Sequence, residues 1–251
     1  MQGSQSIQRA IALLRAVAER QGKGAKLTTL ARQLGLNVDT ARRILKALAE
    51  EGLLEYHEAE KSYCLGFELH RLGADAQRFK IREVFHSVLE RLARQTEDTA
   101  FLVVRSGNDS VVIDRVEGAF PIRTLTHDIG QRVPLGVGAG SLALLASLPA
   151  EECEAVIKAN ADRYHKPYSQ APDQIRKLSE ATRKNGIGMS TRVVMAEAIG
   201  VGVAVINHQG RAVAAVSVAA IYQRMHTERR QEIVQLIREE VARQTWPEEW
   251  D

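Results

Sequence analysis

Residues 27–48 read LTTLARQLGLNVDTARRILKAL, and this stretch decides the fold of the first part of the chain. Apolar residues recur at helical spacing on both sides of Gly35. They are Leu27, Leu30, Ala31 and Leu34 before it, and Ala41, Ile44, Leu45 and Leu48 after it. Thr28 and Asn37 stand where helix N-caps are expected. The pattern predicts two helices joined through the glycine turn, the second ending near Glu51, as in a helix-turn-helix.

The flanking segments complete this unit. Before it, Ile7, Ile11, Leu14 and Val17 form an apolar stripe that stops near Gly22 and Gly24, which predicts a first helix. After Gly52, two short extended runs (53–56 and 62–65) are separated by the polar stretch 57–61, which predicts a β-hairpin. Three helices and a hairpin describe a winged helix-turn-helix domain over residues 1–66.

Charge is distributed unevenly along the chain, whose formal net charge is +3. Residues 1–49 contain nine Lys and Arg against two acidic residues, whereas residues 50–66 contain five Glu against Lys61. A basic block at one end is typical of a domain that binds a polyanion. It is equally typical of a solvated helical face, so charge alone leaves both interpretations open.

The helix predicted after Asn37 adds position to this charge. With its apolar stripe turned inward, its other face presents Asp39, Thr40, Arg42, Arg43 and Lys46. A recognition helix needs short polar groups and Arg near its N-terminal end to reach base edges in the major groove of double-stranded DNA. We expect Arg42 and Arg43 to read guanine or hold phosphate, and Lys46 to contact the backbone. Amides at the helix starts near Thr28 and Asn37 are further phosphate donors.

Beyond residue 66 the pattern changes. Residues 67–79 repeat Leu69, Leu72, Ala76 and Phe79 on one stripe, which predicts a linker helix over about 67–80. Residues 81–251 mix helices and strands, which predicts an α+β sensor-like domain. The expected helices cover 84–95, 141–148, 151–159, 173–185 and a last one capped by Thr227. The expected strands cover 100–105, 110–116, 122–126, 188–193, 199–206 and 212–220.

Composition excludes several classes of protein. No stretch approaches the roughly 18 consecutive apolar residues of a membrane span, so no membrane association is expected. The first ten residues, MQGSQSIQRA, lack the pattern of a signal peptide. Cys64 and Cys153 are too few for a disulfide framework or a zinc cluster, and we expect a cytoplasmic protein.

The chain resembles the IclR family of bacterial transcriptional regulators along nearly its whole length. Segments from both halves carry the resemblance, and they occur in the family's order. They are LTTLA (27–31), LGLNVDTARRIL (34–45), GLL (52–54), YCLG (63–66), PL (134–135), ALLA (143–146) and AAVSV (214–218). The resemblance implies a winged helix-turn-helix domain, a linker helix and a GAF-like effector-binding domain. It also implies homodimers or homotetramers that control catabolic operons in response to small organic acids.

The resemblance further implies an effector pocket. Carried over position by position, its apolar wall falls at Ile122, Leu125 and Val133, and the amides that hold a carboxylate fall at Ala139 and Gly140. Side-chain contacts fall at Ser190, Gly200, Ser217 and Ala219. Amides at a helix N-terminus suit an anion because they are unsatisfied donors aligned with the helix dipole.

This sequence departs from the family pattern inside that pocket. Ser190 stands where family members commonly have an acidic residue, and Gly200 stands where a polar residue is common. Leu142 stands at the position of a common lysine, and Ala219 lacks the hydroxyl that some members have there. These changes predict a less polar and roomier site, suited to an aromatic or aliphatic body with one carboxylate. His127, Arg123 and Arg192 are candidates to complement that carboxylate, although residues of these types more often lie on the surface.

Other chemistry has weaker support. The glycines at 136, 138 and 140 resemble a dinucleotide-binding loop, but the third glycine is not at the spacing that this motif requires. The acidic residue expected about 20 positions later is also missing. Ser141 and Ser217 lie in no nucleophile elbow, and no motif places a His/Asp pair beside them. The seven histidines never cluster at ligand spacing, so no metal, cofactor or catalytic residue is expected.

The sequence thus predicts a ligand-responsive, DNA-binding transcriptional regulator that reads a pseudo-palindromic operator. The alternative is a small-molecule-binding or catalytic protein whose basic helical domain is a protein-interaction module. The sequence leaves open repression or activation, the operon, the effector, and dimer or tetramer.

Overall fold

The computed structural model of the 251-residue chain describes residues 5–20, 23–74, 80–122, 127–191 and 197–244. The chain divides into two compact units, residues 1–79 and 80–251. Each unit has apolar cores of its own. None of the helices in the described ranges combines the length and the apolarity that a bilayer crossing requires.

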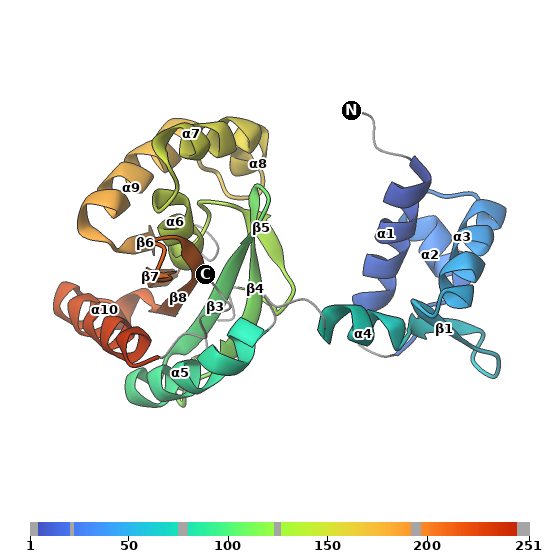
Figure 1. Cartoon of the computed structure of the whole chain (residues 1–251), viewed down its shortest axis with the longest axis horizontal. Coiled ribbons are helices and arrows are strands. Elements are labelled where there is room, and N and C mark those ends of the chain that lie inside the picture. The colour runs from blue at the N-terminus through green and yellow to red at the C-terminus, as the bar shows by residue number, and fades with distance from the viewer. Residues whose placement is uncertain (1–4, 21–22, 75–79, 123–126, 192–196, 245–251) are drawn as a thin grey trace. The chain divides into compact units, whose positions relative to one another are not determined.

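The first unit is a winged helix-turn-helix (Figure 1). Its elements are α1 (Gln5–Ala18), α2 (Leu27–Gln33), α3 (Val38–Glu50), β1 (Leu54–His57), β2 (Ser62–Leu65) and α4 (Glu68–Ala74). The two strands are antiparallel, with Tyr56 opposite Tyr63. Leu13, Leu30, Leu45 and Leu54 from the three helices and the hairpin are all fully buried in one core. The predicted helices and hairpin are therefore confirmed.

One predicted cap in this unit is wrong and another is confirmed. Thr28 does not cap α2, since the helix begins at Leu27 and the cap position is Lys26. The reason lies just before it, because Ala25 pairs with Tyr63 of β2 through two backbone hydrogen bonds of 2.9 Å. This pairing fixes the extended chain up to Lys26, and the helical turn starts directly afterwards. Asn37 is the N-cap of α3, as predicted.

The predicted apolar stripe of α1 is only partly inward. Ile7 and Ile11 are 61% and 43% exposed, whereas Leu13, Ala16 and Val17 are buried. The helix therefore buries its C-terminal half against α2, α3 and β2, whereas Ile7 and Ile11 of its first two turns stay outside the core. Which residues of α1 are buried thus depends on where the helix contacts its neighbours, and not on the longest apolar repeat in its sequence.

The second unit is a six-stranded antiparallel sheet between helices (Figure 1). The strands are β3 (Thr99–Ser106), β4 (Asp109–Val116), β5 (Arg132–Pro134), β6 (Gly188–Thr191), β7 (Ala198–Ile206) and β8 (Ala212–Ile221). Their order in the sheet is β5-β4-β3-β8-β7-β6. The helices are α5 (Lys80–Thr96), α6 (Ala139–Ala146), α7 (Ala150–Ala159), α8 (Ala161–His165), α9 (Pro172–Asn185), the 3-10 turn η2 (Tyr222–Arg224) and α10 (Thr227–Ala242).

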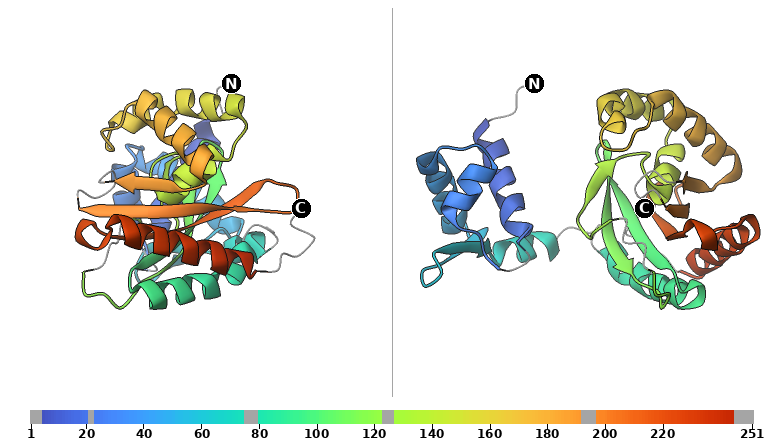
Figure 2. Two further views of the ribbon diagram at one scale, coloured as in Figure 1. Left: turned by 90° about the vertical axis from the view of Figure 1, so that its left-hand side faces the viewer. Right: turned by 180° about the vertical axis from the view of Figure 1, so that it is seen from behind.

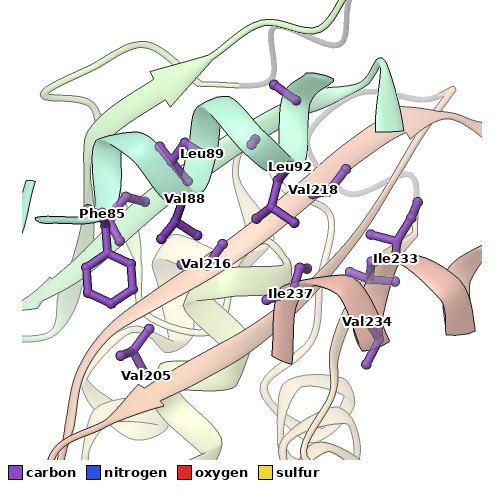
Figure 3. Close-up of a cluster of buried hydrophobic side chains, with 14 of the residues drawn as sticks. Phe85, Val88, Leu89, Leu92, Val205, Val216, Val218, Ile233, Val234 and Ile237 are labelled. Atoms are coloured by element: carbon purple, nitrogen blue, oxygen red, sulfur yellow. The ribbon is translucent and has the colours of Figure 1, made fainter. Parts of the chain in front are cut away.

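The sheet separates two apolar cores. Helices α5 and α10 cover one face, and α6 covers the other together with α7 and α9 (Figure 2). Figure 3 shows the first core, where Leu92 of α5 and Ile237 of α10 lie against Val216 and Val218 of β8. Each such fully buried side chain contributes roughly 1.5–3 kcal/mol to folding. The second core lies around α6, whose eight residues are all buried.

Several boundaries in this unit differ from the prediction. Strand β5 and helix α8 are too short to leave a periodic pattern, and neither was predicted. Ile122 lies in a bend rather than a strand, and residues 123–126 and 192–193 of two predicted strands lie outside the described residues. His226 rather than Thr227 caps α10, because its imidazole accepts a hydrogen bond from the Arg229 amide.

Candidate DNA interface and effector pocket

Helix α3 has a defined start and two distinct faces. The Asn37 side chain accepts a hydrogen bond of 2.8 Å from the Asp39 amide, which satisfies one of the free donors in the first turn. Asp39 also places a negative charge at the positive end of the helix dipole. Ala41, Leu45 and Leu48 are buried in the core of the unit. The side chains between these positions consequently point away from it.

The outer face of α3 carries the predicted DNA-contacting residues. Asp39, Arg42, Arg43 and Lys46 are exposed and Thr40 is half-buried. Arg42 Nη1 lies 3.5 Å from Asp39 Oδ1, and Lys46 Nζ lies 3.6 Å from Glu50 Oε1. The side chains of Arg42 and Lys46 are 62% and 75% exposed, so these pairs are solvated, contribute little to stability, and exchange readily for phosphate or base contacts.

Arg43 differs from its neighbours on this face. In the described part of the chain, no ion pair or hydrogen bond engages its guanidinium. A free guanidinium presents its whole fork of donors, which matches the O6 and N7 acceptors of guanine. Thr28 is exposed in the first turn of α2, and within the described ranges its hydroxyl makes no capping hydrogen bond.

The hairpin tip is acidic. Residues 58–61 turn between β1 and β2, and Glu55, Glu58, Glu60 and Lys61 are exposed. The rings of Tyr56 and Tyr63 are 4.8 Å apart, and burial raises the pKa of the Tyr63 hydroxyl. The winged helix-turn-helix pattern predicts that this tip, near Ala59, contacts the DNA backbone or the minor groove. The carboxylates of the tip oppose a close phosphate contact, so the exposed basic side chains of α3 are better suited than the hairpin tip to contact DNA.

A cavity lies between the sheet and the start of α6. Of the nine predicted effector residues, seven line it: Val133, Ala139, Gly140, Ser190, Gly200, Ser217 and Ala219. Ile122 is 60% exposed and does not line it. Leu125 lies outside the described residues, as do Arg123 and Arg192.

Strand register brings these residues together. Ser190 pairs with Gly200, and Gly200 pairs with Ala219, which forms one row across β6, β7 and β8. In the neighbouring row, Gly202 pairs with Ser217, and Ser217 pairs with Phe101 of β3. Alternate residues of a strand share a face, so both rows point to the same side of the sheet. That side is the one covered by α6.

Glycines allow α6 to lie directly on the strands. A Cβ atom at Gly188 would lie 2.1 Å from the Ala139 carbonyl oxygen, and one at Gly202 would lie 2.9 Å from the Gly140 amide nitrogen. Gly138 at the cap position has a φ of 90°, which L-residues rarely adopt. The first intrahelical bond runs from the Leu142 amide to the Gly138 carbonyl, so the amides of residues 139–141 have no acceptor within the helix.

Three polar residues of the cavity were not in the predicted site. Ser110 donates to the Ser141 hydroxyl over 2.8 Å, and that hydroxyl accepts the Gly136 amide over 2.9 Å, so Ser141 holds the loop before α6. His127, considered from the sequence only as a complement for a carboxylate, lines the cavity, and its buried Nδ1 atom has no hydrogen-bond partner among the described residues. Burial lowers the pKa of His127, although the Gln131 side chain and the negative charge of Asp128 raise it in part.

The cavity is small and weakly polar. Its free volume is about 40 Å³, and a water needs roughly 10–15 Å³ of such space, so it admits only a few water-sized groups. The sequence departures predicted a roomier site. The Ala139 methyl and the Ser190 hydroxyl explain the difference, since both lie within 3.2 Å of where a Cβ on Gly200 would stand and fill the space that glycine leaves. An aromatic effector therefore requires the walls to move apart.

Comparison with known proteins decides the family. Residues 74–245 match the model of the bacterial transcriptional regulator IclR C-terminal domain, and residues 6–58 match the IclR helix-turn-helix domain. The chain belongs to the IclR family. The HTH-type transcriptional regulator KipR of Bacillus subtilis is 28% identical over 205 residues, which cover 81% of each chain.

Solved structures agree with this fold. An IclR transcriptional regulator from Alicyclobacillus acidocaldarius superposes with a TM-score of 0.77 at 23% identity, over 96% of this chain and 97% of its own. An IclR homologue from Microbacterium hydrocarbonoxydans, complexed with 4-hydroxybenzoate, gives a TM-score of 0.78 at 21% identity, over 94% and 96%. This IclR-family chain is thus a transcriptional regulator with a helix-turn-helix domain and the family's C-terminal domain.

Proposed function

We propose that this IclR-family regulator binds a pseudo-palindromic operator of a catabolic operon as a homodimer or homotetramer, and that a small organic acid controls this binding. The observation that carries the proposal is the outer face of α3, where Arg42, Arg43 and Lys46 are exposed on a helix whose opposite face is buried. A two-fold symmetric assembly places two such helices in successive major grooves of double-stranded DNA.

Each predicted residue has a role in this proposal. Arg43 reads a base edge, and Arg42 exchanges its solvated pair with Asp39 for a base or phosphate contact. Lys46 contacts the backbone, Asn37 and Asp39 hold the helix start, and Thr40 and Thr28 contribute hydroxyls. Such phosphate contacts make affinity fall steeply with salt concentration.

The effector in this proposal is a monocarboxylate with an aromatic or aliphatic body. Its carboxylate lies at the free amides of Ala139 and Gly140, where the dipole of α6 favours an anion. The hydroxyls of Ser190 and Ser217 contribute polar contacts, and Val133, Gly200 and Ala219 contact the body. Leu125 is assigned to the apolar wall, and Ile122, which does not line the cavity, has no role in this proposal. The Microbacterium homologue crystallised with 4-hydroxybenzoate supports this chemical class.

Effector and operator affinities are coupled in this proposal. A ligand that binds one DNA-binding arrangement better than another shifts the affinity for DNA, and DNA shifts the affinity for the ligand by the same factor. The small cavity fits such a switch, because a ligand larger than a few waters has to displace the walls formed by α6, β6 and β7.

Isothermal titration of the full chain with acetate, benzoate and 4-hydroxybenzoate tests the pocket. The matched variants are Ser217→Leu, which fills the cavity, and Ser217→Ala, which removes only the hydroxyl. We expect Ser217→Leu to abolish carboxylate binding and the response of DNA binding, with DNA affinity unchanged, and Ser217→Ala to weaken binding only. An unaltered dose-response in Ser217→Leu would show that the effector binds elsewhere.

A further inference from the structure

His127 stands in a fixed position beside the cavity. Arg115 of β4 donates from Nη1 to the His127 carbonyl over 3.0 Å, and the Gly130 amide donates to the Val112 carbonyl over 2.7 Å. The Asp128 amide donates to the Gln131 side chain over 2.9 Å. The turn formed by residues 127–131 is therefore attached to β4 at both ends, which fixes the backbone from which the imidazole projects.

The imidazole reaches the start of α6. Its Nε2 atom lies 3.6 Å from the position that a Cβ on Gly138 would occupy, and Gly138 is the N-cap of α6. Its Nδ1 atom is buried and has no hydrogen-bond partner in the described part of the chain. A buried polar atom without a partner is costly, so a ligand that supplies one gains binding energy.

The cavity contains no other side chain of this kind. Among the described residues that line it, all except His127 are Gly, Ala, Val, Ile, Phe or Ser. A carboxylate that enters such a site loses its hydration without meeting a positive side chain, and this is expensive even with helix amides as donors. His127 is the one described lining residue that is able to become a cation near neutral pH.

We propose that His127 is protonated when a carboxylate effector binds, so that the pocket takes up the carboxylate and one proton together. The proton comes from the solvent and adds to the imidazole, and no covalent bond to the effector forms. This inference rests on the proposed effector function, because it assigns the counter-charge of that pocket. It narrows the effector class to monoanions and excludes uncharged analogues of the same shape.

The charges around His127 agree with an uncharged imidazole in the empty pocket. Burial lowers the pKa of His127 most, whereas the Gln131 side chain and the negative charge of Asp128 raise it by less. The guanidinium of Arg115 is itself paired with Asp128 at 3.0 Å and Glu117 at 3.3 Å, so its positive charge is compensated. On α6, β6, β7 and β8, the described lining residues carry no titratable side chain.

The pH dependence follows from the sign of these effects. A carboxylate next to the imidazole raises the pKa of His127 above its value in the empty pocket. The affinity for the carboxylate is therefore constant at pH values below the His127 pKa of the empty pocket. It falls by about tenfold per pH unit between that pKa and the His127 pKa of the occupied pocket, and it is constant again at higher pH. An uncharged ligand leaves both values equal and its affinity independent of pH.

Histidine-selective NMR of the full chain tests this directly. The His127 resonance is identified by its loss in His127→Gln, and its pKa is measured with no ligand and with two matched pairs of probes. The pairs are acetate with acetamide, which suit the small cavity, and 4-hydroxybenzoate with 4-hydroxybenzamide. The exposed His208, in the turn after β7, serves as internal control, and His208→Gln is the matched variant.

We expect each bound carboxylate, and neither amide, to raise the pKa of His127, and the His208 resonance at a fixed pH to be unaffected by all four probes. His127→Gln should bind carboxylates with an affinity that no longer varies with pH. A carboxylate that shifts the Gly140 amide resonance but leaves the pKa of His127 unchanged contradicts this inference alone. If no carboxylate perturbs either residue, the proposed pocket is wrong as well.

Discussion

Helices α3 and α6 are both central to the proposed function, but they are built in opposite ways. Only three residues of α3 are buried and its polar face is exposed, whereas all eight residues of α6 are buried. The surface of α3 depends on the sequence of α3 and its neighbours in the chain. The surroundings of α6 depend on glycines in β6 and β7, about 50 residues or more away along the chain.

This difference teaches where each site is vulnerable. Substitutions on the outer face of α3 remove contacts to a partner and leave the fold intact, because those side chains are solvated. Substitutions around the first turn of α6 disturb the packing that creates the pocket, because an added Cβ at Gly188 or Gly202 meets backbone atoms of α6 at 2.1 or 2.9 Å. The following changes are ordered by the size of the effect that this comparison predicts.

Gly188→Ala should have the largest effect. A Cβ at this position would lie 2.1 Å from the Ala139 carbonyl oxygen and 2.9 Å from the Ala143 amide nitrogen, and backbone atoms cannot rotate away. We expect a loss of about 3 kcal/mol or more in the free energy of unfolding of the second unit. Circular dichroism during thermal unfolding measures it. Gly73→Ala is the matched control, since nothing lies within 4 Å of its added Cβ, and equal melting temperatures for the two variants would contradict the packing account.

Arg43→Ala should affect only DNA binding. Loss of a bidentate base contact costs about 1–3 kcal/mol, which is roughly a five- to 150-fold loss of specific affinity, and relaxes preference at one base pair. Lys46→Ala is the comparison variant, because loss of a phosphate contact weakens all sequences about equally. Quantitative footprinting of the full chain measures both. An unchanged footprint and affinity in Arg43→Ala would remove α3 as the reading element.

Asn37→Ala should weaken the start of α3. The lost hydrogen bond to the Asp39 amide costs about 1 kcal/mol of stability in the first unit. Asn37→Asp keeps an acceptor oxygen and should retain most of that stability. Urea unfolding of the two variants compares them, and equal losses would mean that the cap does not hold the helix.

Glu58→Gln together with Glu60→Gln should have the smallest effect. Both carboxylates are exposed on the hairpin tip, so their repulsion of phosphate is screened by salt. We expect DNA affinity to rise by about threefold at low salt, and the difference to disappear at high salt. A fall in affinity would instead mean that these side chains accept hydrogen bonds at the DNA surface.

The sequence predicted most of the first unit because its elements are periodic and local. Asn37, the α3 stripe and the hairpin are all read from neighbouring residues. Thr28 was wrongly predicted as a cap, because the backbone pairing of Ala25 with Tyr63 sets the start of α2. Ile7 was wrongly predicted to be buried, because the N-terminal part of α1 has few contacts with the rest of the unit.

Less of the pocket was predictable from local pattern, and the resemblance to the family supplied most of it. Strand β4 shows why. An irregularity in its pairing with β3 between Leu102 and Val103 interrupts the alternation, so Val112 lines the cavity while Asp114, two residues later, is bonded to His86 of α5 on the opposite face at 2.7 Å. The position of His127 depends equally on long-range contacts with β4.

Fluorescence anisotropy of the full chain on the DNA upstream of its own gene tests the central claim most directly. A scrambled duplex is measured in parallel at two salt concentrations, with and without benzoate, 4-hydroxybenzoate and acetate. The account predicts tighter binding to the native duplex, a steep fall of affinity with salt, and a change in affinity with at least one carboxylate. Equal binding to both duplexes under every condition would contradict it.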